Sequence, residues 1–270
     1  MYKLLIIFLL SLISIAYAGE ITVSEQNEIK DFYQKCLFPT VKLTYKQKND
    51  EKKGGVASGF IVRSEKHEDH YKNIVITAAH IVESLNGELN VMIPKFDDKL
   101  RLSKFESYTG QIFAKNSSQD LAVVLFISKE KCPEAIFDFD ADLFISSKIF
   151  KIGYGLGDDI RYESGEINST FIKEPKVFEG MYRFSSYTIF GDSGGPVFNK
   201  HNNKVIGVTI AIRAMENQFL THHAYACPVI KIKEWDQKVN GNITFCYDKN
   251  KKIPVLPFVQ LMWREYIITE

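Results

Sequence analysis

Gly191-Asp192-Ser193-Gly194-Gly195-Pro196 is the stretch on which the interpretation of this 270-residue chain depends. It places one serine hydroxyl among glycines, which let a substrate carbonyl approach the backbone closely. A serine hydroxyl is a weak nucleophile at its ordinary pKa, so it needs a base within hydrogen-bonding reach and a carboxylate that orients this base. The hexapeptide therefore predicts acyl transfer on Ser193 if the chain supplies both partners.

Two upstream segments supply these partners. Thr77-Ala78-Ala79-His80 follows the apolar run Ile74-Val75-Ile76, so an imidazole stands at the end of a predicted strand. Asp120 precedes the apolar run 121–126, whereas the competing carboxylates lie in polar surroundings, at Asp97, Asp98, Asp158 and Asp159. We predict that His80 is the general base and then the general acid, and that Asp120 accepts its Nδ1 hydrogen.

The order His, Asp, Ser along the chain resembles that of the trypsin-like, chymotrypsin-fold serine proteases, over residues 56–239. Three further segments resemble the HtrA/DegP branch of these proteases, namely Ala57–Val62, Ile152–Gly157 and Val205–Val208. The resemblance implies an all-β fold of two packed antiparallel β-barrels, with the triad in the cleft between them. It also implies hydrolysis through an acyl-enzyme, without a cofactor.

The chain departs from the HtrA pattern around and after the nucleophile. Asp192 stands where HtrA proteins usually carry Asn. The chain has no activation site of the Ile-Val-Gly-Gly type, so the expected partner of Asp192 is a lysine, an arginine or backbone amides. Only 77 residues follow Ser193 (270 − 193), and the second barrel needs about half of them. The remainder is too short for a PDZ domain, so we expect none.

The resemblance also assigns the groups around the scissile bond. The amides of Gly191 and Ser193 are expected to form the oxyanion hole. Trypsin-like enzymes that cleave after Lys or Arg carry a carboxylate six residues before the nucleophile, where this chain has Tyr187. The residues expected to bind the substrate side chain are Tyr187, Thr188, Thr209, Ile210, Ala211 and Ile212. Their mostly uncharged character predicts small or medium uncharged P1 residues.

Short β-branched or aromatic runs, separated by glycine and polar clusters, support the β-barrel interpretation. They are Val41–Thr44, Gly59–Val62, Ile74–Thr77, Leu89–Ile93, Leu121–Phe126, Ile149–Gly153, Gly165–Ile172, Met181–Ser185, Pro196–Phe198 and Val205–Ile212. Residues 132–147 are the expected bridge between the barrels. Helical periodicity predicts a short N-terminal helix at 25–36 and a closing helix that starts at Pro228.

These patterns divide the chain into four parts. Residues 1–18 combine Lys3, an apolar run and a small-x-small end at Ala16-Tyr17-Ala18, which is typical of a cleaved signal peptide. The apolar run is shorter than the roughly 20 residues of a spanning helix, so an uncleaved anchor is disfavoured. Residues 19–40 form an N-terminal segment, 41–240 the protease domain and 241–270 a C-terminal extension. The signal predicts a secreted or periplasmic protein, not held in the membrane after cleavage.

The cysteines and the net charge indicate which cross-links and which partners to expect. An exported chain with four cysteines favours two disulfides, and the preferred pairing is Cys36 with Cys132 and Cys227 with Cys246; four buried thiols are the alternative. No spacing of cysteines or histidines indicates a metal site. The net charge of +1 argues against nucleic acid as a partner and leaves protein or peptide substrates.

We therefore expect an exported serine endopeptidase. A catalytically silent homologue that acts as a secreted binding module is the alternative, although such proteins usually lose a triad member and this chain has all three. A third possibility is a protease held latent by its N-terminal segment, residues 19–53.

Overall fold

A computed structural model describes residues 23–47, 50–83, 85, 87–173, 176–215 and 218–254. The chain divides into two units, Met1–Tyr33 and Gln34–Glu270. The predicted signal peptide and the apolar residues at the end of the extension, Phe258, Leu261, Met262 and Trp263, lie outside the described residues. No helix in the described ranges combines the length and the apolar character needed to cross a membrane.

The N-terminal helix is shorter than predicted. Helix α2 spans Val23–Phe32, and none of its residues is buried. A π-helical turn, η1, follows at Tyr33–Leu37 and buries Cys36 and Leu37. The apolar residues that predicted one helix over 25–36 therefore belong to two elements, and burial is confined to the second.

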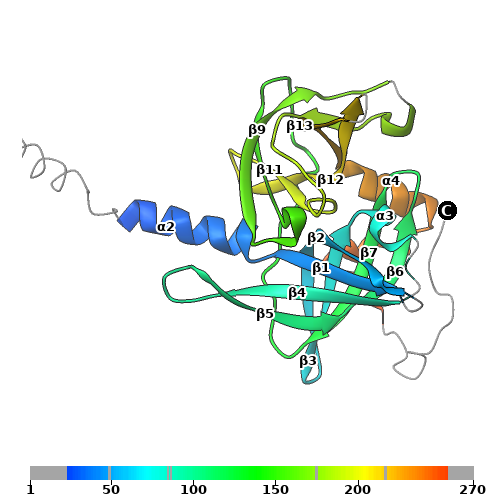
Figure 1. The fold of residues 1–270 in the computed structure, drawn as a ribbon. Helices are drawn as coiled ribbons and strands as arrows, with labels where there is room; N and C mark the ends of the chain where they lie inside the picture. Colours follow the sequence, from blue (N-terminus) through cyan, green and yellow to red (C-terminus); the bar gives the residue numbers. More distant parts are fainter. Residues whose placement is uncertain are drawn as a thin grey trace, which may run out of the picture. The chain divides into compact units, whose positions relative to one another are not determined.

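The first half of the larger unit is a seven-stranded antiparallel sheet in the order β5-β4-β1-β2-β3-β7-β6 (Figure 1). Its strands are β1 (Thr40–Gln47), β2 (Asp50–His67), β3 (His70–Thr77), β4 (Glu88–Phe96), β5 (Leu102–Thr109), β6 (Gln111–Asn116) and β7 (Leu121–Ser128). Strand β7 is buried at seven of its eight positions, because side chains pack on both of its faces. The core of this sheet includes Val41, Leu43, Ile61, Val75, Val91 and Val124.

The second half is a closed barrel in the order β10-β13-β12-β11-β8-β9. Its strands are β8 (Lys148–Gly153), β9 (Arg161–Ser169), β10 (Tyr182–Phe184), β11 (Pro196–Asn199), β12 (Lys204–Met215) and β13 (Gln218–Pro228). Its core contains Ile149, Ile167, Phe184, Val197, Ile206, Ala224 and Ala226. The two β assemblies confirm the predicted two-barrel class.

All ten predicted runs fall wholly or mainly in strands, but three strands were not predicted. These are β5, β6 and β13. The sequence of β5 does not alternate apolar and polar residues, which is the pattern by which a half-buried strand is recognised. In agreement with this, none of its residues is buried. The residues between β7 and β8 bond to both halves: Ala135 N–H donates to Ile61 O (2.7 Å) and Asp138 N–H donates to Val205 O (2.8 Å).

Helix α4 and the segment after it close the described part of the chain. Helix α4 spans Ile230–Lys238 and buries Ile232, Trp235 and Asp236. The following 3-10 turn, η4 (Thr244–Cys246), is held to the first sheet by Arg63, whose guanidinium donates to Phe245 O (2.9 Å). The turn η4, in the predicted C-terminal extension, is thus packed against the first sheet.

The predicted disulfides are wrong, because Cys36, Cys132, Cys227 and Cys246 are all buried cysteines that form no disulfide in the described structure. Each sulfur has its own surroundings: that of Cys36 lies 3.7 Å from Asn203 O, and that of Cys132 lies 3.6 Å from the Ser128 hydroxyl. Burial raises the pKa of the Cys227 and Cys246 thiols. Protonated thiols are poor nucleophiles, so these cysteines serve the packing of the core.

Candidate active site

His80 and Asp120 are in direct contact. His80 lies in the single-turn helix α3 (Ala79–Val82), directly after strand β3. Its backbone N–H donates to Asp120 Oδ1 (2.8 Å), and its Nδ1 lies 2.7 Å from Asp120 Oδ2. The imidazole is 42% exposed and the carboxylate 23%. This geometry places the hydrogen on Nδ1 and leaves Nε2 as the basic nitrogen.

Strand register brings these two residues together. Strands β3 and β7 pair with Thr77 opposite Ala122, so the residue two positions before Ala122 lies beside the segment that follows Thr77. Asp120 ends the turn between β6 and β7 and has a φ of 53°. Aspartate tolerates this left-handed conformation better than most residues. The turn is closed by Gln119 N–H, which donates to Asn116 Oδ1 (2.9 Å).

Ser193 belongs to the second barrel, in the loop that leads into strand β11. Its carbonyl accepts a hydrogen bond from Ser58 N–H of the first sheet (2.8 Å). The next residue, Gly194, has a φ of +85°, and a Cβ at this position would lie 2.1 Å from Thr77 Oγ1. The serine loop therefore packs against the segment that carries His80. Among the described residues, however, no hydrogen bond joins the Ser193 and His80 side chains.

Residues 57–208 match the family model of the trypsin-like peptidase domain. The chain belongs to the trypsin-like peptidase family. No curated protein sequence matches the chain.

Solved structures of proteases share the fold of this peptidase. The HtrA-type protease AlgW with tripeptide superposes with a TM-score of 0.62 at 16% identity, over 80% of this chain and 64% of that chain. Deg5 has a TM-score of 0.58 at 19% identity, over 80% of this chain and 95% of that chain. The serine endoprotease from Yersinia pestis has a TM-score of 0.57 at 14% identity, over 79% of this chain and 66% of that chain. The chain thus spans slightly less than two thirds of AlgW and of the Yersinia protease.

The loop before Ser193 presents two backbone amides. Phe190 O accepts a hydrogen bond from Leu156 N–H (2.6 Å), which belongs to the 3-10 turn η2 (Gly155–Gly157). The carbonyl and amide of one peptide unit point in opposite directions, so this bond turns Gly191 N–H away from η2. Neither the Gly191 nor the Ser193 amide donates to another described residue. Both remain available to an oxyanion.

Ser58 is a site residue that the sequence did not reveal. It is fully buried in β2, and its hydroxyl donates to Gly191 O (2.7 Å) while accepting from Tyr154 N–H (2.9 Å). Its carbonyl accepts from the Thr77 hydroxyl (2.8 Å). Its place between Ala57 and Gly59, in an otherwise apolar run, was the available signal.

Lys151 is the second residue that was missed. Its Nζ lies 2.7 Å from Asp192 Oδ2, and both side chains are 1% exposed. Burial lowers the pKa of Lys151, and the neighbouring Asp192 carboxylate opposes this effect. A lysine inside the apolar run Ile149–Ile152 needs a buried partner, so the sequence did contain a signal.

The predicted substrate-binding residues lie around the second barrel, in different degrees of exposure. Thr188, Thr209 and Ile210 are buried, whereas Tyr187 and Ala211 are half-buried. Ile212 packs against the core of the barrel. The guanidinium of Arg161 lies over the Tyr187 ring, 5.0 Å from its centroid. The same guanidinium forms an ion pair with Glu163, at 2.9 Å.

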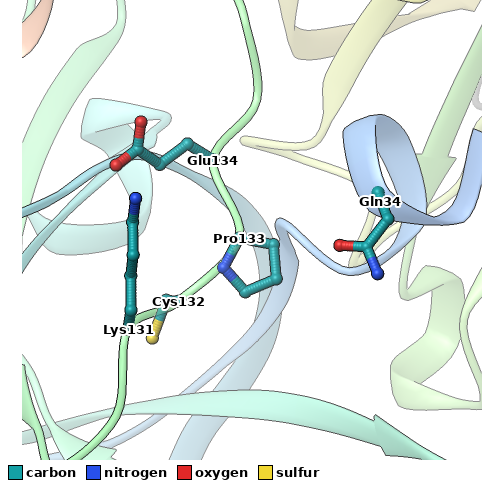
Figure 2. Close-up of a pocket in the computed structure, with 5 residues that line it drawn as sticks. All are labelled: Gln34, Lys131, Cys132, Pro133 and Glu134. Carbon is teal, nitrogen blue, oxygen red and sulfur yellow. The ribbon is translucent and has the colours of Figure 1, made fainter. Parts of the chain in front are cut away.

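A separate cavity lies away from these groups. Figure 2 shows that it is lined by Gln34, Lys131, Cys132, Pro133 and Glu134, none of which belongs to the predicted triad or substrate-binding set. The described residues contain no group of three or more His, Cys, Asp or Glu side chains that could hold a metal ion.

The close approach of Gly194 to the first sheet leads to a stability prediction. In Gly194→Ala, the new Cβ meets Thr77 Oγ1 and the Ser58 carbonyl oxygen at 2.1 and 2.2 Å. In the control Gly180→Ala, the φ is also positive (+72°), but the nearest atom is 3.5 Å away. We expect the control to lose roughly 1 kcal/mol of unfolding free energy, from backbone strain alone. Gly194→Ala should lose at least roughly 3 kcal/mol, because overpacking adds to the strain.

Urea denaturation followed by circular dichroism measures both free energies. Equal losses for the two variants would contradict the close packing of the serine loop against Thr77 and Ser58.

Proposed function

We propose that this peptidase hydrolyses peptide bonds with Ser193 as nucleophile, His80 as acid–base catalyst and Asp120 as the residue that orients His80. The contact of His80 with both oxygens of the Asp120 carboxylate is the observation that carries the proposal. The backbone contact holds the Asp120 carboxylate in place, and the Nδ1 contact fixes the tautomer of the imidazole. The close packing of Gly194 against Thr77 supports the placement of Ser193 beside this pair.

The chemistry follows from these positions. His80 Nε2 takes the proton of the Ser193 hydroxyl as its oxygen attacks the substrate carbonyl. The Gly191 and Ser193 amides stabilise the oxyanion, and Asp120 stabilises the imidazolium. His80 then donates the proton to the leaving amine, which breaks the peptide bond and leaves an acyl group on Ser193. Water, deprotonated by His80, attacks this ester and regenerates the hydroxyl.

The substrate-binding surface supports a preference for small or medium uncharged P1 residues. Buried Ile210 and half-buried Ala211 offer apolar contacts, and neither Tyr187 nor Thr188 carries a charge. The Arg161 guanidinium beside Tyr187 is already paired with Glu163, and no carboxylate stands at position 187 or 188 to bind a lysine or arginine side chain.

Export is the proposed location of this activity. The motivation is the signal-like sequence of residues 1–18, which ends in Ala16-Tyr17-Ala18. N-terminal sequencing of the exported protein should begin at Gly19. Recovery of chain that begins at Met1 from the exported fraction would contradict cleavage.

Labelling by a fluorophosphonate probe tests the triad. The wild-type chain should become labelled on Ser193, and Ser193→Ala should not, whereas the exposed-serine control Ser107→Ala should label like wild type. His80→Ala should lower peptide hydrolysis by about 10⁶-fold, because removal of a triad base has an effect of this order. His201→Ala replaces an exposed histidine and is the matched control.

Circular dichroism of each variant confirms that it is folded. Strand β1 belongs to the core of the first sheet, so the trimmed chain lacks only residues 19–33. If a folded wild-type chain, with and without these residues, resists the probe, the binding-module alternative replaces this proposal.

Peptides that differ only at P1 test the specificity. We expect kcat/KM for alanine or valine at P1 to exceed that for lysine or arginine by at least about 10-fold, because a buried apolar contact is exchanged for an unpaired charge. A chain that cleaves best after lysine or arginine would contradict the assignment of the substrate-binding residues.

A further inference from the structure

The loop that carries the proposed nucleophile contains a buried negative charge. Asp192 is 1% exposed, and its Oδ2 accepts a hydrogen bond from Ile189 N–H (2.9 Å). Its backbone bonds to the same turn, since Asp192 N–H donates to Ile189 O (3.1 Å) and Gly195 N–H donates to Asp192 O (3.0 Å). The position of this one residue therefore shapes the turn from Ile189 to Gly195.

The barrel interior has space for this carboxylate only because two neighbours are glycines. A Cβ on Gly153 would lie 2.7 Å from Asp192 Oδ1, and one on Gly155 would lie 3.2 Å from it. Oδ1 has no hydrogen-bond partner among the described residues. A carboxylate in this position needs a cation, because an unpaired buried charge is strongly unfavourable.

Lys151 supplies this cation from a rigid support. Its Nζ lies 2.7 Å from Asp192 Oδ2, and it is itself 1% exposed. Strand β8, on which it lies, is hydrogen-bonded on both sides: Lys151 is opposite Glu163 of β9 and Val197 of β11. A lysine held by two neighbouring strands fixes the carboxylate more firmly than a lysine on a loop would.

The position of the Asp192 side chain affects the proposed oxyanion donors through the backbone. Asp192 is the residue between Gly191 and Ser193, whose amides are the proposed oxyanion donors. A displaced Asp192 side chain would rotate the peptide units on both of its sides. A shift of about 1 Å in such donors is enough to reduce catalysis strongly.

We propose that Lys151 is a positioning residue of this peptidase, which holds the Asp192 carboxylate inside the barrel and thereby aligns the Gly191 and Ser193 amides with the nucleophile. The inference rests on the proposed function. It assigns to Lys151 a role in the reaction although its side chain touches no reacting atom.

Four chains test the inference: the wild type, Lys151→Met, the double variant Lys151→Met/Asp192→Asn, and the control Lys148→Met. Methionine keeps most of the volume of Lys151 and removes its charge. Lys148 is on the same strand, but its ion pair with Glu166 is exposed. The double variant has no charge at either position, and its asparagine oxygen still accepts from Ile189 N–H. Each chain is measured by its fluorophosphonate labelling rate and by kcat and KM on one peptide, well below its melting temperature.

Lys151→Met should lower kcat and the labelling rate by about 10²–10³-fold, the range for a lost oxyanion donor, with KM changed by less than about 3-fold. Lys148→Met should behave as wild type. The double variant should recover to within about 10-fold of wild type, because no uncompensated charge remains.

A folded Lys151→Met with wild-type kcat would overturn the inference. If Lys151→Met does not fold, the double variant decides: recovery of fold and labelling supports the inference, and failure of either overturns it. A wild-type chain that does not label would instead contradict the proposed function.

Discussion

The hydrogen bonds of Ser58 are the interaction on which the rest of the site depends. Its amide binds Ser193 O, its hydroxyl binds Gly191 O and Tyr154 N–H, and its carbonyl binds the Thr77 hydroxyl. One buried residue of the first sheet thus holds the serine loop of the second barrel and the strand end that precedes His80. The residues of the proposed triad come from two β assemblies, and the hydrogen bonds of Ser58 connect these assemblies.

Each assembly holds its own part of the chemistry. In the first sheet, the pairing of β3 with β7 and the turn that ends at Asp120 bring His80 and Asp120 together. In the second barrel, Lys151 pairs with Asp192, which lies in the turn that carries the proposed nucleophile Ser193. The His80–Asp120 pair, to which we assign proton transfer, is partly exposed, whereas the Lys151–Asp192 pair is buried. This difference is physically reasonable, because the first pair must meet the substrate and the second must exclude water to stay strong.

The sequence predicted the groups that occupy recognisable motifs and missed those that act through packing. His80 follows an apolar run, Asp120 precedes one and Ser193 lies among glycines, so each could be recognised from its neighbours in the sequence. Ser58 lies in the middle of a strand, and its role depends on a neighbour more than 130 residues away. The disulfide prediction failed because the spacing of cysteines says nothing of the distance between them. Strand β5 was missed because no side chain in it is buried.

A crystal structure of the chain after reaction with the fluorophosphonate probe tests the central claim most directly. The account predicts phosphorus bonded to Ser193 Oγ, with the phosphoryl oxygen about 2.7–3.1 Å from the amide nitrogens of both Gly191 and Ser193. It also predicts that His80 still contacts Asp120 through Nδ1. Phosphorus on another residue, or a phosphoryl oxygen directed away from both amides, would contradict the account.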